Sequence, residues 1–124
     1  MLKREDLRQY PDSAEWFITL PNGADLVFSA IDNPPSQNLI EQAEDIITNL
    51  DFLVSRSLDY IDIWVDRDRP GIGHRYELYA VYVIADNKLV KLEFNFPEDE
   101  FSEWWVVFTT PMYCPVSFGR NQTY

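Results

Sequence analysis

Residues 36–66 are the one stretch of this chain with a sustained helical period, and this stretch limits the folds that are available. Its apolar residues recur at spacings of three and four, which keeps them on one side of a helix with 3.6 residues per turn. They are Leu39, Ala43, Ile46, Ile47, Leu50, Val54, Leu58 and Ile61. We expect this side to be buried against the rest of the chain, with a centre formed by Ile46, Ile47, Leu50 and Val54.

The predicted helix begins after Pro34 and Pro35, with Ser36 as its N-cap. A continuous helix over residues 36–66 would be longer than most helices of globular proteins, so the sequence predicts an interruption. Residues 49–51 are one candidate position. The β-branched and aromatic residues after Tyr60 are another, and we place the end of the main helix near Tyr60.

A hairpin is expected before the helix. Residues 14–20 and 24–31 are apolar and flank Asn22-Gly23, a dipeptide that favours a two-residue type I′ turn. A loop of two residues would place Thr19 opposite Leu26 in the ladder.

Three strands are expected after the helix, over residues 75–85, 89–96 and 104–110. The second of these alternates, with Lys91, Glu93 and Asn95 on one solvated face, whereas residues 75–85 lack a polar side and should be central and covered on both faces. Residues 111–124 contain two prolines and should wrap the sheet edge as irregular chain, with Phe118 in the core.

The element order is therefore ββαβββ. Strands joined by short turns imply an antiparallel sheet, and one amphipathic helix covers one of its faces. The sequence thus predicts an α+β fold, a two-layer sandwich of one long helix on a mostly antiparallel five-stranded sheet. Residues 1–124 have the length and apolar content of a single domain.

Composition limits the location and the partners. The first ten residues are charged where a signal peptide is apolar, the longest apolar run has eight residues against about 20 for a membrane span, and Cys114 is the only cysteine, so we expect a cytoplasmic protein. The net charge is −11, which disfavours nucleic acid and anionic membranes as partners and favours basic proteins. The oligomeric state stays open.

No catalytic signature is present. His74 is the only histidine, and no motif with it, Cys114 or a glycine-rich loop has the spacing of a nucleophile, a metal site or a cofactor site. Asp62, Asp66 and Asp68 could suggest a metal site, but Arg67 and Arg69 alternate with them and would repel a cation. We therefore predict no catalytic residue, no metal and no cofactor.

Aromatic residues support a second hypothesis, that of a small enzyme or ligand-binding module with an aromatic pocket. The residues concerned are Trp16, Trp64, Trp104, Trp105, Tyr76, Tyr79 and Tyr82. Aromatic residues on neighbouring strands also pair within cores, so we expect most of this set to be buried.

The polar side of the helix is the strongest functional feature of the sequence. It carries seven carboxylates and one basic residue, Arg56, where exposed helices usually mix both signs. The predicted partner-binding residues are these carboxylates together with Trp64 as an apolar anchor: Glu41, Glu44, Asp45, Asp51, Asp59, Asp62, Asp66 and Trp64. Such a stripe would steer a basic protein, and a third hypothesis is that it imitates the phosphates of a nucleic acid.

In size, acidity, cysteine content and aromatic strands the chain resembles the small acidic immunity proteins that bacteria make against polymorphic and contact-dependent toxins. This resemblance implies a non-enzymatic protein that binds a basic toxin domain and neutralises it. It assigns no individual residue a role.

Overall fold

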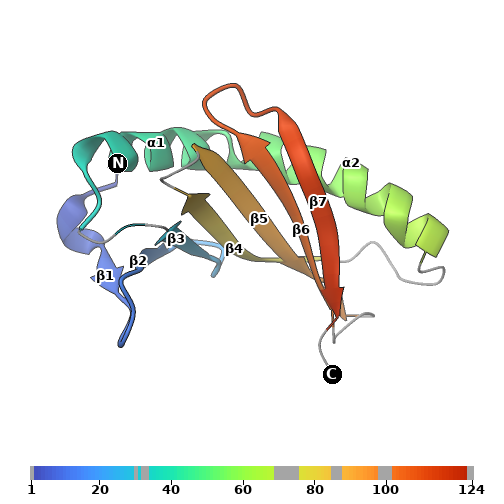
Figure 1. Cartoon of the computed structure of the whole chain (residues 1–124), viewed down its shortest axis with the longest axis horizontal. Helices are drawn as coiled ribbons and strands as arrows, with labels where there is room; N and C mark the ends of the chain where they lie inside the picture. Colours follow the sequence, from blue (N-terminus) through green and yellow to red (C-terminus); the bar gives the residue numbers. More distant parts are fainter. Residues whose placement is uncertain are drawn as a thin grey trace.

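The computed structural model describes residues 2–29, 31, 34–68, 76–84, 88–97 and 102–122, and at residues 64–68 and 122 it describes the backbone alone. Within these residues, a sheet carries two helices on one side (Figure 1). The helices are α1 (Gln37–Thr48) and α2 (Leu50–Asp68), and a 3₁₀ turn, Arg4–Asp6, precedes the sheet. The described strands are β1 (Arg8–Gln9), β2 (Trp16–Thr19), β3 (Asp25–Ser29), β4 (Glu77–Ile84), β5 (Leu89–Asn95), β6 (Ser102–Thr109) and β7 (Pro115–Gln122).

The seven strands lie in the sheet in the order in which they occur in the chain. All neighbouring pairs are antiparallel except β3 with β4. These two are parallel because the two helices return the chain to the end of the sheet at which β3 begins. The expected architecture of one long helix on a five-stranded, mostly antiparallel sheet is therefore wrong. The structure is α+β, with two helices on a seven-stranded mixed sheet.

The two strands that the sequence did not predict are the edges of the sheet. β1 is only two residues long and pairs with β2 through Arg8 and Gln9, too few residues to show a period. β7 lies in the tail that was expected to be irregular, and it pairs with β6 over most of its length. Pro115 is tolerated there because it stands at the first position of an edge strand.

The hairpin between β2 and β3 has a three-residue loop, Pro21-Asn22-Gly23, in place of the predicted two-residue turn. The Gly23 amide donates to the Leu20 carbonyl at 2.9 Å, and Gly23, with φ +92°, occupies the left-handed region alone of the three. Pro21 favours the second position of a type I turn, which a left-handed glycine then closes. The longer loop shifts the register by one residue, so that Thr19 faces Asp25 and Ile18 faces Leu26.

Ser36 caps α1 as predicted, with its Oγ accepting from the Leu39 amide at 3.3 Å. The helix breaks at Asn49, whose amide is shared between the Asp45 and Ile46 carbonyls, at one of the two positions that the sequence offered. The predicted end near Tyr60 is wrong, because α2 continues to Asp68. Ile61 is fully buried, and this packing outweighs the weak helix preference of the β-branched residues after Tyr60.

The buried side of the helices is rotated slightly from the predicted one. Ile46 is fully buried as expected, whereas Ile47, Leu50 and Val54 are only partly buried. The fully buried positions also include Ile40, Ala43, Leu53, Ser57 and Ile61. Ser57 can be buried because its hydroxyl donates to the Leu53 carbonyl at 2.8 Å.

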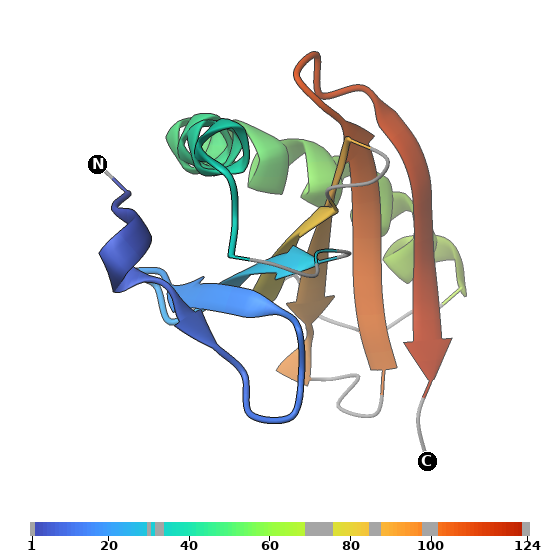
Figure 2. The ribbon, with the colours of Figure 1, turned by 60° about the vertical axis from the view of Figure 1, so that its left-hand side comes forward.

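Core side chains lie between the helices and one face of the sheet. Figure 2 shows that the sheet is strongly twisted, so that its first strands run at a large angle to its last ones. The largest fully buried side chains are Phe28, Phe94, Phe96 and Phe108. The opposite face of the sheet has no described helix against it. β4 is central, as predicted, but it is not covered on both faces, because Tyr79 is 53% exposed.

Candidate functional site

The side of α1 and α2 that is turned away from the sheet forms a continuous exposed surface, which we call the outer helix face. We define it by the exposed residues Glu41, Asp45, Asp51, Phe52, Ser55, Arg56, Asp59 and Ile63; Gln37, Asn38 and Thr48 of α1 are also exposed. Four of these are carboxylates and one is a guanidinium, so the surface is acidic. The Arg56 guanidinium lies 6.0 Å from the centre of the Tyr60 ring, which holds it beside its own helix.

Two large apolar side chains are exposed on this acidic surface. Phe52 is 53% exposed and Ile63 is 62% exposed. They stand eleven residues apart on α2, which corresponds to three turns and about 16 Å along the axis, and Asp59 lies between them on the same side. Apolar groups surrounded by charged ones are typical of the anchors of a protein interface.

Sequence analysis did not single out Phe52 and Ile63. The signal that could have found them is that both are apolar and both fall outside the buried stripe. Their spacing of eleven residues places them together on the polar side of a helix.

The predicted acidic residues are not equivalent in the structure. Glu41, Asp51 and Asp59 are exposed, whereas Glu44 and Asp62 are half-buried, and Asp62 has a further interaction. Glu44 lines a groove of about 490 Å³ between α1 and the β2–β3 hairpin, together with Ile18, Leu20 and Ile47. The side chains of Asp66 and Trp64 lie outside the described residues, although both positions belong to α2.

The Asp45 carboxylate contacts another part of the fold. Its carboxylate accepts a short hydrogen bond from the Tyr113 hydroxyl, which lies in the connection between β6 and β7. Burial, and then this bond to the carboxylate, raise the pKa of Tyr113 above its ordinary value. The side-chain amide of Gln42 also donates to the Thr110 hydroxyl at 3.0 Å, so the connection between β6 and β7 is fixed to α1 at two points.

The aromatic residues are divided among the core, the edges of the structure and the face of the sheet opposite the helices, which we call the open face. Trp104 is buried and packs edge-on against Phe96, with 6.0 Å between the ring centres, while Trp16 and Trp105 are half-buried. Tyr76 and Tyr79 are exposed, and Tyr82 is half-buried on the open face of the sheet. These positions do not form one common aromatic pocket.

Candidate catalytic groups are not brought together among the described residues. Cys114 is an exposed free thiol, and its amide donates to the Thr109 hydroxyl at 3.1 Å. His74 lies outside the described residues. Within the described part of the chain, no cluster of three or more histidine, cysteine, aspartate or glutamate side chains is placed to bind a metal ion. Neither described helix is both long enough and apolar enough to cross a membrane.

In comparisons with known proteins, no family model, no curated protein and no solved structure matched the chain. Functional inference therefore depends on the geometry of the site. The outer helix face places exposed carboxylates beside two exposed apolar side chains, an arrangement that is typical of protein-binding surfaces.

Proposed function

We propose that this chain is a non-enzymatic binding protein that neutralises a basic protein partner through the outer helix face. The observation that carries the proposal is the exposure of Phe52 and Ile63 on the same side of α2 as Asp59. Exposed carboxylates attract a basic surface and set the association rate, and the two apolar anchors, which the partner would cover, set the dissociation rate. A net charge of −11 extends the attraction beyond the contact itself.

A bacterial toxin with a basic substrate-binding surface is the partner class that the resemblance to immunity proteins suggests. In this version of the proposal, the protein covers that surface and blocks access of the substrate. The product of a reading frame adjacent to the gene would be the first toxin to test. Expression of this chain would restore growth to cells that produce the toxin.

The test begins with capture of the partner by the purified chain and by a Phe52→Asp/Ile63→Asp variant. We expect the variant to keep its fold, because both side chains are exposed, and to lose the partner. Val116→Asp is the matched control, since Val116 is similarly exposed but lies in β7, outside the outer helix face, and its replacement should leave binding unchanged. Equal capture by all three proteins would overturn the proposal.

Association kinetics then separate the two parts of the surface. Glu41→Lys/Asp51→Lys/Asp59→Lys should slow association at low salt, and the wild-type rate should fall as salt is added, because screening acts beyond about 8 Å at physiological ionic strength. Asp45 is left unchanged because it holds Tyr113. A wild-type association rate that is independent of salt would show that the carboxylates take no part in binding.

A further inference from the structure

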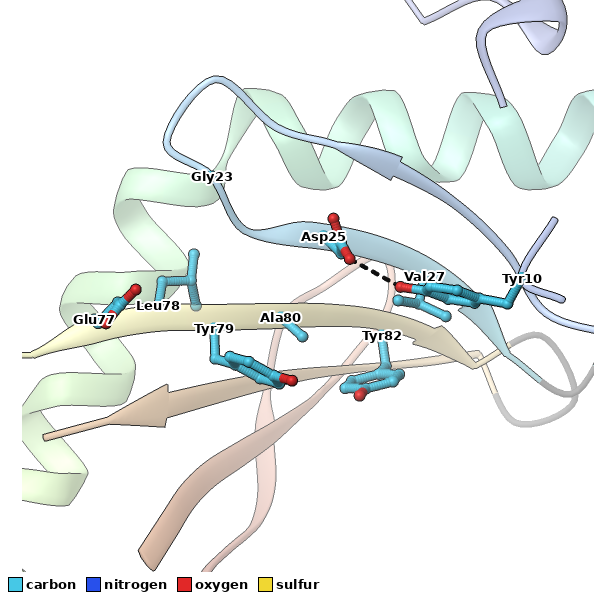
Figure 3. A pocket seen from close by; sticks show the side chains of 9 residues that line it. All are labelled: Tyr10, Gly23, Asp25, Val27, Glu77, Leu78, Tyr79, Ala80 and Tyr82. Carbon is cyan, nitrogen blue, oxygen red and sulfur yellow. Dashed lines mark hydrogen bonds between the residues drawn. The ribbon is translucent and has the colours of Figure 1, made fainter. Parts of the chain in front are cut away.

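The open face of the sheet contains a cavity of about 230 Å³ beside β3 and β4 (Figure 3). Its walls include the rings of Tyr10, Tyr79 and Tyr82, the carboxylate of Asp25 and the methyl group of Ala80. The helices lie on the other side of the sheet, so this cavity is separate from the outer helix face. Its volume exceeds the roughly 150 Å³ of a protein cavity that accepts benzene.

A β-bulge in β4 builds the aromatic wall. Leu78 pairs with Phe94 and Ala80 pairs with Glu93, so Tyr79 is the extra residue between them. A bulge redirects a side chain, and here Tyr79, Ala80 and Tyr82 all project to the same side of β4 (Figure 3). The small side chain of Ala80 leaves the space that the two rings border.

Asp25 supplies a negative charge at the wall of this cavity. It lies beside Ala80 in the parallel pairing of β3 with β4, and its two oxygens accept from the Tyr10 hydroxyl at 2.9 Å and the Thr19 hydroxyl at 2.8 Å. Both donors are neutral, so the charge of the carboxylate is retained. Among the described residues, no lysine or arginine forms an ion pair with Asp25.

The hydroxyls of Tyr10 and Tyr82 stay protonated at physiological pH, so both rings are neutral. Burial raises the pKa of Tyr82 to about 12, and the charge of Glu93 adds to this effect. Burial and the bond to Asp25 raise the pKa of Tyr10 in the same direction. The Lys91 ammonium lies 4.8 Å from the centre of the Tyr82 ring, so this ring already attracts a cation of the chain, and Glu93, whose oxygen is 3.1 Å away, offsets the charge of Lys91.

We propose that this cavity binds a methylated ammonium group between the rings of Tyr79 and Tyr82, with Asp25 as the counter-charge. Aromatic faces attract cations through the ring quadrupole, and a methylated ammonium group is only weakly hydrated, so it loses little on leaving water. A divalent metal ion would require several oxygen ligands, and of the residues that line the cavity only Asp25 and Glu77 carry carboxylates. The ligand carries its charge either as a free quaternary ammonium compound or on a methylated lysine side chain.

The test is a titration of the full chain with tetramethylammonium chloride, followed by the NMR signals of the tyrosine ring protons. tert-Butanol is the neutral probe of similar size, and sodium chloride at the same ionic strength controls for screening. We expect the ring signals of Tyr79 and Tyr82 to shift with tetramethylammonium and not with the other two. A peptide with a trimethylated lysine then distinguishes a side chain from a free ion as the preferred source.

Variants of the cavity residues test whether tetramethylammonium binds in the cavity. Tyr79→Leu/Tyr82→Leu should weaken tetramethylammonium binding by about tenfold, since each ring contributes a factor of about 2 to 5. Asp25→Asn should bring the affinity for tetramethylammonium towards that for tert-butanol. Tyr76→Leu is the matched control, because Tyr76 is also exposed but packs against Phe94 outside the cavity.

Three results would overturn the proposal: no saturable shift in the wild type, equal affinity for the charged and neutral probes, or unchanged affinity in Tyr79→Leu. The single variant keeps the test valid if the double variant fails to fold, because Tyr79 is exposed. Phe52→Asp/Ile63→Asp should bind tetramethylammonium like the wild type, so this result is independent of the proposed protein partner.

Discussion

At the scale of single residues, the packing around Gly119 leaves no space for a side chain. Gly119 in β7 lies opposite Trp105 in β6, and the indole covers it. A Cβ atom at this position would lie 2.6 Å from the Trp105 Cζ2 atom, closer than van der Waals contact permits. The requirement for glycine here is steric.

We predict that Gly119→Ala lowers the free energy of unfolding by about 1–3 kcal/mol, because the indole must leave its position. Ser117→Ala, two residues away on the same strand and exposed, should change it by less than about 0.5 kcal/mol. In a Trp105→Leu background the cost of Gly119→Ala should fall by more than half, as denaturant titration would measure. An equal cost in both backgrounds would assign the effect to the backbone.

The Tyr82 hydroxyl makes the free energy of unfolding depend on pH in the alkaline range. Its folded pKa of about 12 lies above the ordinary value of about 10, so the unfolded chain releases this proton more readily. The stabilisation that protonated Tyr82 contributes to the folded state is therefore complete below about pH 10 and is lost as the pH rises towards 12. Tyr82→Phe removes this proton, and its unfolding free energy should fall less steeply over this interval than that of the wild type. Parallel curves would contradict the assignment.

At the scale of elements, the register of the helices against the sheet determines which side chains are fully buried. The apolar period identified the correct side of residues 36–66 but centred it on Leu50, whereas Leu53 is fully buried and Leu50 only partly. A stripe of apolar residues covers a wide arc of a helix, so the residue at its middle depends on the orientation of the helix.

Leu53→Ala should cost about 2–5 kcal/mol, as large-to-small changes in a core do, and Leu50→Ala should cost less. Phe52→Ala, the neighbouring exposed position, should cost under about 1 kcal/mol. Denaturant unfolding of the three variants measures this order. A larger loss for Leu50→Ala than for Leu53→Ala would restore the helix face that the sequence predicted.

At the scale of the whole molecule, acidity is the dominant property. A net charge of −11 on 124 residues places many like charges within one small fold, where they repel one another. The outer helix face carries part of this surplus, and the open face of the sheet carries Asp25 and Glu77 beside the cavity.

We predict that the midpoint of thermal unfolding rises as sodium chloride is raised from about 0.01 M to about 0.15 M, because the screening length falls from about 30 Å to about 8 Å. Glu41→Lys/Asp51→Lys/Asp59→Lys replaces three negative charges with three positive ones, which lowers the net negative charge by six units, and should show a smaller rise. Calorimetry measures both. A midpoint that does not change with salt in the wild type would show that repulsion is unimportant for folding.

Local signals in the sequence predicted several parts of this structure correctly. Ser36 after two prolines predicted the start of α1, and Asn49 was one of two predicted breaks. The alternation in residues 89–96 identified one buried face of β5, but Glu93, which was expected on the solvated face, is also buried. These features depend on contacts within one or two turns or along one strand, so neighbouring residues determine them.

The remaining features depend on residues that are far apart in the chain. The parallel pairing of β3 with β4 and the bond between Asp45 and Tyr113 join segments more than 50 residues apart. The strand β7 forms through its pairing with β6, although the prolines before and at its start do not favour a strand. The cavity likewise requires Tyr10 from before β2, Asp25 from β3 and a bulge in β4. By itself, the sequence determined the helical segment, its cap and the acidic surplus, because these are properties of local order and composition. Only the tertiary structure decided which strands are neighbours and which side chains meet, because many non-local contacts of similar energy compete and the packing of the whole chain selects among them.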